Sequence, residues 1–337
     1  MITLGVFDHI DDNYRTLSEL YAERLELAAA CDRAGFYAYQ VSEHHGTPHG
    51  HTPSPNLFLA AMAQRTRRLR LGPLVMLLNL YHPLRAFEEV CMLDQISGGR
   101  VEVGLGSGGS PIEPGFFGIA VDEARERYRE CMGIVLKAME VNRLSHDGPY
   151  FHLDDVPITL APAQRPRPPL WHATMNAEGA AWAAEHGFNL ASAGTTANVR
   201  EITGAYHAHR RADAAGPAPM VGMVRQIVVA DSEMEARALA APAYERWFET
   251  LHYLLRTRGH STTMLAPPSF EAAVEEGFSI VGTPRQVRET LLRQAAETDV
   301  NYVLCQLAFG NLPLSASLAT VEALRSEVMP HLRRPLQ

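Results

Sequence analysis

The sequence predicts an α/β protein of the (β/α)8 TIM-barrel class. Three observations support this: short apolar runs alternate with amphipathic helical stretches, eight such units can be counted, and the chain has 337 residues of which 46% are hydrophobic. Strands that alternate with helices are typical of a parallel sheet buried on both faces, and eight units close into a barrel. A barrel of this length is usually one domain, so we expect residues 1–337 to form a single domain.

Eight short apolar runs rich in β-branched and aromatic residues are predicted as strands. They are Ile2–Phe7, Tyr37–Ser42, Leu69–Leu78, Val101–Gly106, Leu170–Thr174, Asn189–Ala193, Met220–Val229 and Tyr302–Leu307. Stretches with apolar residues at helical spacing predict the intervening helices. These are Leu20–Ala34, Asn56–Thr66, Leu84–Ile96, Asp122–Asn142, Ala177–His186, Val199–Ala214, Pro284–Glu297 and Leu318–Leu332. The third helix has the clearest bounds, because Pro83 suits a first turn and Gly98-Gly99 suits a left-handed end.

Two connections exceed the usual length of barrel loops. Residues 145–169 contain six prolines and a Tyr-Phe-His-Leu segment, which indicates a small hairpin and a surface crossover. Residues 240–280 contain aromatic side chains at helical spacing, which most often pack in a core. A long insertion after a barrel strand can also cover the active face. We therefore predict that residues 240–280 form a lid that shapes the substrate pocket.

Charge and cysteine content exclude several classes of protein. A net charge of −8 and a pI near 6.0 give no basic face for nucleic acid, and the arginines of residues 65–70 are interpreted as a solvated helix end. The four cysteines are far apart without CxxC spacing, which favours reduced core thiols. The start of the sequence lacks a charged leader with an apolar core, and no apolar run is long enough to span a membrane. We expect a cytoplasmic protein.

Two histidines follow a predicted strand directly. His44 and His45 come after Tyr37–Ser42, and barrel active sites lie at the carboxyl ends of the strands. A catalytic and a structural interpretation have about equal weight from this position alone. Metal binding is an alternative, because His49 and His51 follow closely and imidazole is a common zinc or iron ligand. The Gly-Thr-Pro segment between them predicts a mobile loop that places His49 and His51 loosely, so no metal ligands are assigned.

A glycine-rich segment, Gly104–Gly109, formally matches the GxGxxG pattern of dinucleotide-binding folds. In those folds the glycine turn opens directly into a helix whose first turn receives the pyrophosphate. Here residues 110–115 follow, with two prolines and a glycine, which favour a loop. We interpret the segment as the end of a barrel strand whose glycines allow close approach of a ligand.

The order of these motifs resembles the bacterial luciferase-like flavin monooxygenases, and the resemblance covers nearly the whole chain. It is carried by Ala34-Gly35-Phe36, Ser42-Glu43-His44-His45, His82-Pro83-Leu84-Arg85, residues 92–100 and residues 101–106. That family consists of TIM barrels that use reduced FMN or, in some branches, coenzyme F420. The resemblance implies that His44 lies beside the flavin ring and manages protons, and we predict His44 and His45 as the catalytic pair.

The resemblance also implies a place for the flavin ring. An FMN site needs an apolar slot, partners for the polar edge of the ring and donors for the phosphate. Leu74 and Val75 lie where the family commonly carries a non-prolyl cis peptide behind the ring, and the sequence leaves the isomer open. Gly106 and Ser107 match the strand end beside the ring.

For the phosphate, the resemblance points to residues at the start of a helix, where free N–H groups favour an anion. They are Thr174, Met175, Asn176 and Gly179, together with Arg125. Asn176 is equally an ordinary N-cap. Many relatives have an arginine where this chain has Ser107, which predicts weak FMN binding. Weak binding fits an enzyme that takes reduced flavin from a separate NAD(P)H:flavin reductase, and it also fits F420 or a degenerate site.

The resemblance implies a two-component monooxygenase. Reduced FMN (FMNH₂) reacts with O₂ at C4a to give a peroxyflavin, which oxygenates a small or medium organic substrate, and relatives form homodimers. One alternative keeps the fold and transfers hydride with F420. The other is a flavin-binding protein without catalysis. The substrate cannot be read from the sequence, because the pocket walls come from divergent loops.

Overall fold

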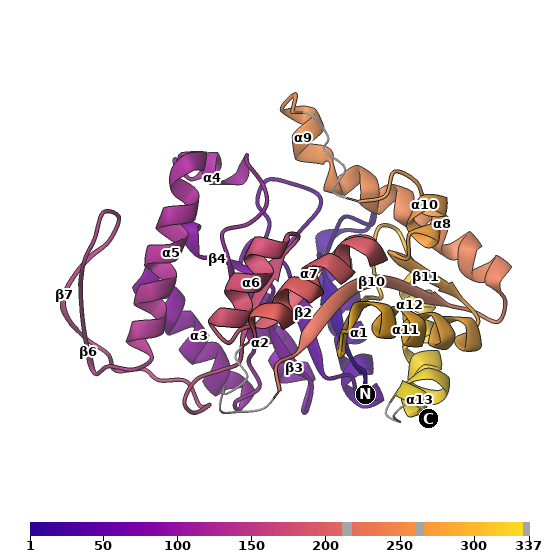
Figure 1. The fold of residues 1–337 in the computed structure, drawn as a ribbon, viewed down its shortest axis with the longest axis horizontal. Coiled ribbons are helices and arrows are strands. Elements are labelled where there is room, and N and C mark those ends of the chain that lie inside the picture. Colours follow the sequence, from indigo (N-terminus) through magenta and orange to yellow (C-terminus); the bar gives the residue numbers. More distant parts are fainter. Residues whose placement is uncertain (211–217, 261–265, 333–337) are drawn as a thin grey trace.

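The barrel is closed by eight parallel strands. The computed structural model describes residues 1–210, 218–260 and 266–332 (Figure 1). The barrel strands are β1 (Thr3–Asp8), β2 (Ala38–Val41), β3 (Arg70–Pro73), β5 (Val103–Gly106), β8 (Leu170–Thr174), β9 (Asn189–Ser192), β10 (Val221–Val229) and β12 (Tyr302–Gln306). Their order is β3-β2-β1-β12-β10-β9-β8-β5, and a parallel bridge between Leu71 and Val101 joins β3 to the segment that leads into β5. The (β/α)8 prediction is confirmed, with all eight strands in place.

Helices surround the barrel close to their predicted positions, with two differences. The helix Glu233–Leu251 was not predicted, and the single helix predicted over Leu318–Leu332 starts at Leu314 and is divided into three segments. The helices are α1 (Leu17–Ala34), α2 (Pro55–Arg65), α3 (Pro83–Ser97), α5 (Val121–Ala138), α6 (Ala177–Glu185), α7 (Thr196–His209), α8 (Glu233–Leu251), α11 (Pro284–Thr298), α12 (Leu314–Ala323) and α13 (Met329–Leu332), with a π-helical turn Leu324–Val328 before α13. The helix predicted to reach Asn142 ends at Ala138, and the predicted helix end at Ala214 lies outside the described residues. Within the described ranges, no helix has the length and apolarity to cross a membrane.

One predicted strand is divided in two. The run predicted from Leu69 to Leu78 forms β3 and then β4 (Met76–Leu77), which pairs with β5, followed by a 3₁₀ turn (Leu78–Leu80). The peptide bond Leu74–Val75 between the two strands is cis. The bounds of α3 are as predicted, because Pro83 occupies the first turn and Gly98 ends the helix in the left-handed region at φ +69°.

The two long connections have different structures. The first contains β6 (Arg143–Asp147) and β7 (His152–Pro157), an antiparallel hairpin that projects away from the barrel in Figure 1, so the predicted hairpin is confirmed. The second contains the end of α8, then α9 (Tyr253–Thr257), α10 (Phe270–Glu275) and the start of β11 (Ser279–Gly282). Residues 279 and 280, the last of the predicted lid region, belong to β11, which pairs with β10 in the sheet, and the lid itself stays a prediction. Residues 261–265 of the predicted lid lie outside the described residues.

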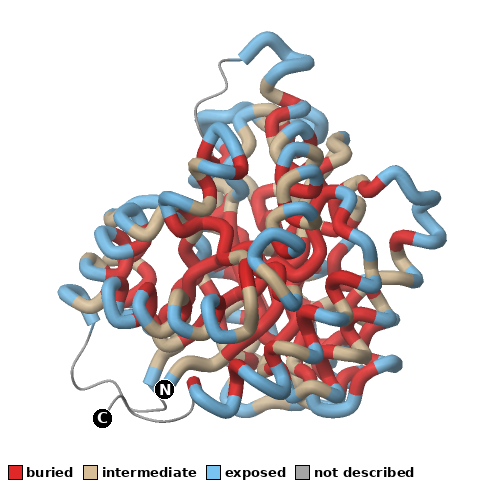
Figure 2. The backbone as a smooth tube through the Cα atoms, turned by 90° about the vertical axis from the view of Figure 1, so that its right-hand side faces the viewer, coloured by how far each residue is buried: buried red, intermediate tan, exposed pale blue. Residues whose placement is uncertain are grey.

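The core has an inner and an outer layer. Successive residues of a strand point to opposite faces, so one set fills the barrel and the other packs against the helices. The inner set is Phe7, Leu74, Trp171, Ala191, Val224, Tyr302 and Leu304. The outer set is much larger and includes Cys31, Cys91, Cys131 and Cys305, all buried and free as predicted. Figure 2 shows the buried chain at the centre and the exposed chain on the outer turns of the helices.

Gly72 of β3 tests the contact that closes the barrel, between β3 and the residues just before β5. An added Cβ on Gly72 would overlap the Glu102 carbonyl oxygen. Since backbone at this contact cannot move without separating β3 from β5, we expect Gly72→Ala to lower the free energy of unfolding by about 1–3 kcal/mol. Gly133→Ala in α5 is the control, because an added Cβ meets nothing within 4 Å there and a helix favours alanine by roughly 0.5–1 kcal/mol. Urea unfolding measures both, and equal effects would contradict the closure.

Candidate active site

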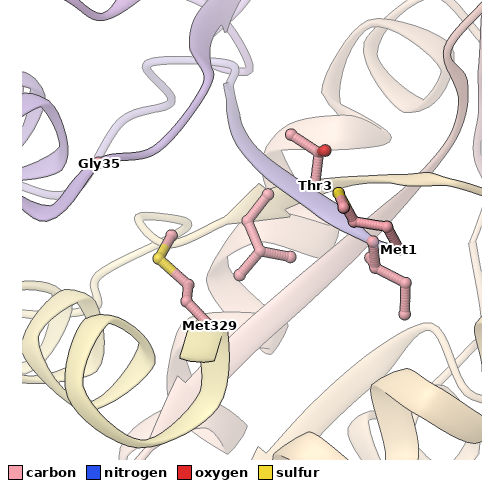
Figure 3. Close-up of a pocket in the computed structure, with 6 residues that line it drawn as sticks. Met1, Thr3, Gly35 and Met329 are labelled. Atoms are coloured by element: carbon pink, nitrogen blue, oxygen red, sulfur yellow. The ribbon is translucent and has the colours of Figure 1, made fainter. Parts of the chain in front are cut away.

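The carboxyl ends of the barrel strands define where a site belongs. The chain starts at the bottom of Figure 1 and runs directly into β1, so the parallel strands end toward the top, where α4 (Glu113–Phe116) and α9 lie. A hollow lined by Met1, Thr3, Gly35 and Met329, shown in Figure 3, lies at the opposite end of β1. The candidate site therefore lies at the carboxyl end of the barrel, where residues 42–52 follow β2, and not at the end that carries this hollow.

His44 is held by a buried carboxylate. His44 Nδ1 lies 3.1 Å from Glu113 Oε1, and the backbone N–H of His45 donates to Glu113 Oε2, also at 3.1 Å. The side chain of Glu113 is 4% exposed and that of His44 is 27% exposed. A carboxylate accepts hydrogen bonds, so Nδ1 carries the hydrogen and Nε2 is left as the reactive nitrogen. Glu113 was missed in the sequence, because it lies far from His44 along the chain.

His45 has a different partner. Its Nε2 lies 3.0 Å from Glu43 Oε1, and its ring packs edge-on against Phe117. Glu43 also accepts from the Leu77 N–H at 3.0 Å and the Tyr81 hydroxyl at 3.2 Å. Burial raises the pKa of Glu43, and the hydrogen bonds from His45 and its neighbours oppose that rise. His45 thus belongs to a network that joins the end of β2 to β4, and its catalytic role stays a prediction.

Two further imidazoles gather beside His44. The rings of His9 and His49 lie 4.1 Å apart between centroids, and each lies within 6 Å of the His44 ring. Burial is the main cause that holds the pKa of His9 and His49 well below the ordinary value, and the neighbouring imidazoles lower both further. Both rings are therefore neutral at pH 7. His9 was missed, although it follows the end of β1 as His44 follows β2, and the same strand-end rule would have found it.

The loop that carries His49 is packed, which corrects the prediction of a mobile segment. His49 is 3% exposed and its Nδ1 lies 3.3 Å from the Thr250 hydroxyl. The Asp12 N–H donates to the Pro48 carbonyl at 2.9 Å, and the His51 N–H donates to the Ile10 carbonyl at 3.0 Å. The loop after β1 and the loop after β2 therefore hold each other. His51 does not join the cluster of His9, His44 and His49, and neither does His45.

Helix α8 reaches this cluster from the predicted lid. Trp247 packs near His9 and His49, at 6.4 and 6.1 Å between ring centroids, and Thr250 is bonded to His49. A neighbouring hollow is lined by Pro48, Arg246, Glu249, Thr250, Tyr253 and Arg256. The first part of the predicted lid region therefore forms a wall of the carboxyl face.

The residues predicted beside a flavin ring lie together. Gly106 of β5 faces Val75, since a Cβ on Gly106 would lie 2.5 Å from Val75 Cγ2. This contact explains why a glycine stands there. Ser107 and the rest of the glycine-rich segment form a loop that leads to α4, so the segment does not open directly into a helix, as predicted. The helical turn of α4 falls partly in residues 110–115, where the sequence predicted only loop.

The residues predicted at a phosphate also converge. Asn176 accepts from the Gly179 N–H at 2.8 Å and caps α6, so its N-cap interpretation is confirmed. Thr174 packs closely against Gly179, and Met175 is 54% exposed. Arg125, in the first two turns of α5, forms a 3.0 Å ion pair with Glu178 in the first turn of α6. This ion pair bridges the starts of α5 and α6 through two exposed side chains.

The fold is a parallel eight-stranded barrel, and a histidine hydrogen-bonded to a buried carboxylate lies where the strands end. These two features are typical of α/β-barrel enzymes. Residues 2–301 match the luciferase-like monooxygenase family. The chain belongs to that family. Its relatives that carry a functional name, such as the trigonelline and limonene monooxygenases, are oxidoreductases.

Three similar proteins place the chain within the family. It is 50% identical to the uncharacterized protein y4wF of Sinorhizobium fredii, covering 97% of this chain and 96% of that protein. It is 24% identical to the oxygenase component of the flavin-dependent trigonelline monooxygenase of Acinetobacter baylyi, covering 97% and 94%. The crystal structure of the monooxygenase RslO1 from Streptomyces bottropensis superimposes with a TM-score of 0.89 at 27% identity, covering 98% and 99%.

Proposed function

We propose that this chain is a flavin-dependent monooxygenase that uses reduced FMN and O₂ to oxygenate a small or medium organic substrate. The observation that carries the proposal is the pair of His44 and Glu113 at the carboxyl face, in a chain of the luciferase-like family. The similarity to a flavin-dependent oxygenase component supports the cofactor. Bound reduced FMN supplies two electrons to O₂, so that one oxygen atom enters the substrate and the other leaves as water.

The residues present fit a flavin. The side-chain amide of Asn79, just after β4, is buried, and neither its oxygen nor its nitrogen has a partner among the described residues. An unpaired buried amide is costly unless a ligand satisfies it, and the polar edge of a flavin ring offers both a donor and an acceptor. Val75 and Gly106 would face the ring, with Leu74 behind Val75 in the core. Ser107 would lie at the strand end beside it.

His44 would hold and move a proton at Nε2. Glu113 fixes the ring and keeps the hydrogen on Nδ1, so the lone pair of Nε2 faces the site. The aromatic wall of Trp247 on α8 would exclude water from the same space. His45 would contribute by holding the loop through Glu43.

The proposal is tested by oxygen incorporation. The protein is mixed with photoreduced FMN and ¹⁸O₂ in the presence of a library of small organic molecules, and the products are analysed by mass spectrometry. We expect one ¹⁸O atom in the product of the true substrate. Turnover with reduced F420 in the absence of O₂ would instead support hydride transfer. Bound flavin without turnover of any library member under either condition would support a non-catalytic flavin-binding protein.

We infer that the phosphate of FMN would lie between Arg125 and the start of α6, near Thr174 and Met175, where Glu178 competes for the arginine. We expect Arg125→Ala to weaken FMN affinity about tenfold, and Glu178→Gln to strengthen it about threefold to tenfold, because a negative charge beside the phosphate is removed. Glu185→Gln, at the other end of α6, is the control. Fluorescence titration with FMN measures all three, and equal affinities in the two glutamine variants would contradict this placement.

The oligomer and the redox partner are part of the same proposal. The helices α2 and α3 pack against each other and carry three exposed large apolar side chains, Leu57 on α2 and Met92 and Ile96 on α3, so we propose a homodimer that covers these two helices. We expect light scattering to give the mass of a dimer, and Ile96→Asp to give a monomer; a monomer before the substitution would contradict the interface.

An oxygenase component needs reduced flavin from elsewhere, so we propose a separate NAD(P)H:flavin reductase as partner.

A further inference from the structure

We propose that His9, His44 and His49 form a binding site for a divalent transition-metal ion such as Zn²⁺, at the mouth of the barrel. One ring nitrogen from each of the three residues lies within 4.8 Å of the others. The three come from loops after two neighbouring strands, β1 and β2, so the barrel holds them in one place. Three imidazoles with an open fourth position are a known zinc ligand set.

Hydrogen bonds at Nδ1 leave Nε2 free on two of the rings. The Thr250 hydroxyl donates to the Trp247 carbonyl at 2.8 Å, so its oxygen must accept from His49 Nδ1. His49 Nε2 therefore carries a lone pair, and this atom is buried with no hydrogen-bond partner among the described residues. Glu113 accepts from His44 Nδ1 in the same way, so His44 Nε2 also offers a lone pair.

The third ring has a partner that can adapt. His9 Nδ1 lies 2.9 Å from the side-chain amide of Gln306, whose oxygen is buried and unpaired among the described residues. Turning that amide presents the oxygen to His9 Nδ1 and leaves Nε2 as the ligand. Metal-bound histidines almost always donate their second N–H to an oxygen, and here Glu113, Thr250 and Gln306 each stand in that position.

The geometry needs only a small adjustment. Zinc bound at about 2.0–2.1 Å to three nitrogens in tetrahedral geometry holds them roughly 3.4 Å apart. The three nitrogens are at most 4.8 Å apart, so each pair has to close by no more than about 1.4 Å to reach that spacing. An ion there would occupy His44 Nε2, so Zn²⁺ would inhibit the reaction reversibly. This consequence rests on the proposed function, whereas the binding of the ion does not.

The site is tested by calorimetric titration of the chelator-treated full chain with Zn²⁺. We expect one ion per chain with a Kd of about 1 µM or tighter. His44→Ala and His49→Gln should each weaken binding at least about tenfold, because each removes one of three imidazoles, and His51→Ala, outside the cluster, should bind as the unaltered protein does. Thr250→Val should weaken binding about tenfold and Thr250→Ser should restore it.

Two results would overturn the site. One is the absence of a bound ion at equimolar Zn²⁺; the other is equal affinity of His44→Ala, His49→Gln and His51→Ala. Circular dichroism shows whether each variant folds, and the partly exposed His44 decides the question if the His49 variant does not fold. Because binding is measured without flavin, a failure here leaves the proposed monooxygenase function standing, and a failure of that function leaves the metal site standing.

Discussion

His44→Ala is expected to lower kcat by about 10²–10⁴, because it removes the group that would transfer a proton at the reacting centre. FMN should still bind, because its phosphate would be held at the starts of α5 and α6, although the variant loses the contact between His44 and the flavin ring. His51→Ala is the matched control, because His51 lies on the same loop and outside the cluster. Initial rates with the substrate found by ¹⁸O labelling, together with a flavin titration, measure both effects. Unchanged turnover with flavin still bound would refute the assignment.

Glu113→Ala is expected to lower kcat about a hundredfold, although Glu113 acts only through His44. The substitution leaves the His44 Nδ1–H and the His45 backbone N–H without their acceptor, and each hydrogen bond to a charged group contributes about 1.5–3 kcal/mol. A purely structural role would lower stability without changing the tautomer of His44. We therefore expect ¹⁵N NMR of the imidazole to show loss of the Nδ1–H tautomer in Glu113→Ala.

A conservative variant separates position from charge. Glu113→Gln keeps an oxygen that can accept from Nδ1, so it should retain more of the Nδ1–H tautomer and more activity than Glu113→Ala. If the two variants have the same tautomer and the same rate as the unaltered protein, Glu113 has no part in positioning His44.

Much of the fold could be predicted, because the signals are local. A buried parallel strand is a run of apolar residues, and α3 is bounded by Pro83 and Gly98 whatever surrounds it. The short strand β11 was missed because it pairs only with the last residues of β10, after a long insertion, and only four residues carry the signal. The division of the third strand was also missed, since its apolar run continues through the break at residues 74–75.

The site was only half predictable, for a related reason. His44 and His45 are adjacent in sequence and follow a strand, so the barrel rule identifies their position. Glu113 and Thr250 reach the histidines from distant segments, and no local pattern shows such a contact. The loop after β2 was read as mobile from its glycines and proline, although its packing against the loop after β1 orders it.

The central claim is that reduced flavin binds at the carboxyl face with His44 beside the ring. A crystal structure of the chain soaked with FMN tests this most directly. We expect the ring against Val75 and Gly106, in contact with His44, and the phosphate between Arg125 and the start of α6. Flavin bound at another place, or a fully occupied FMN whose ring lies away from His44, would contradict the account.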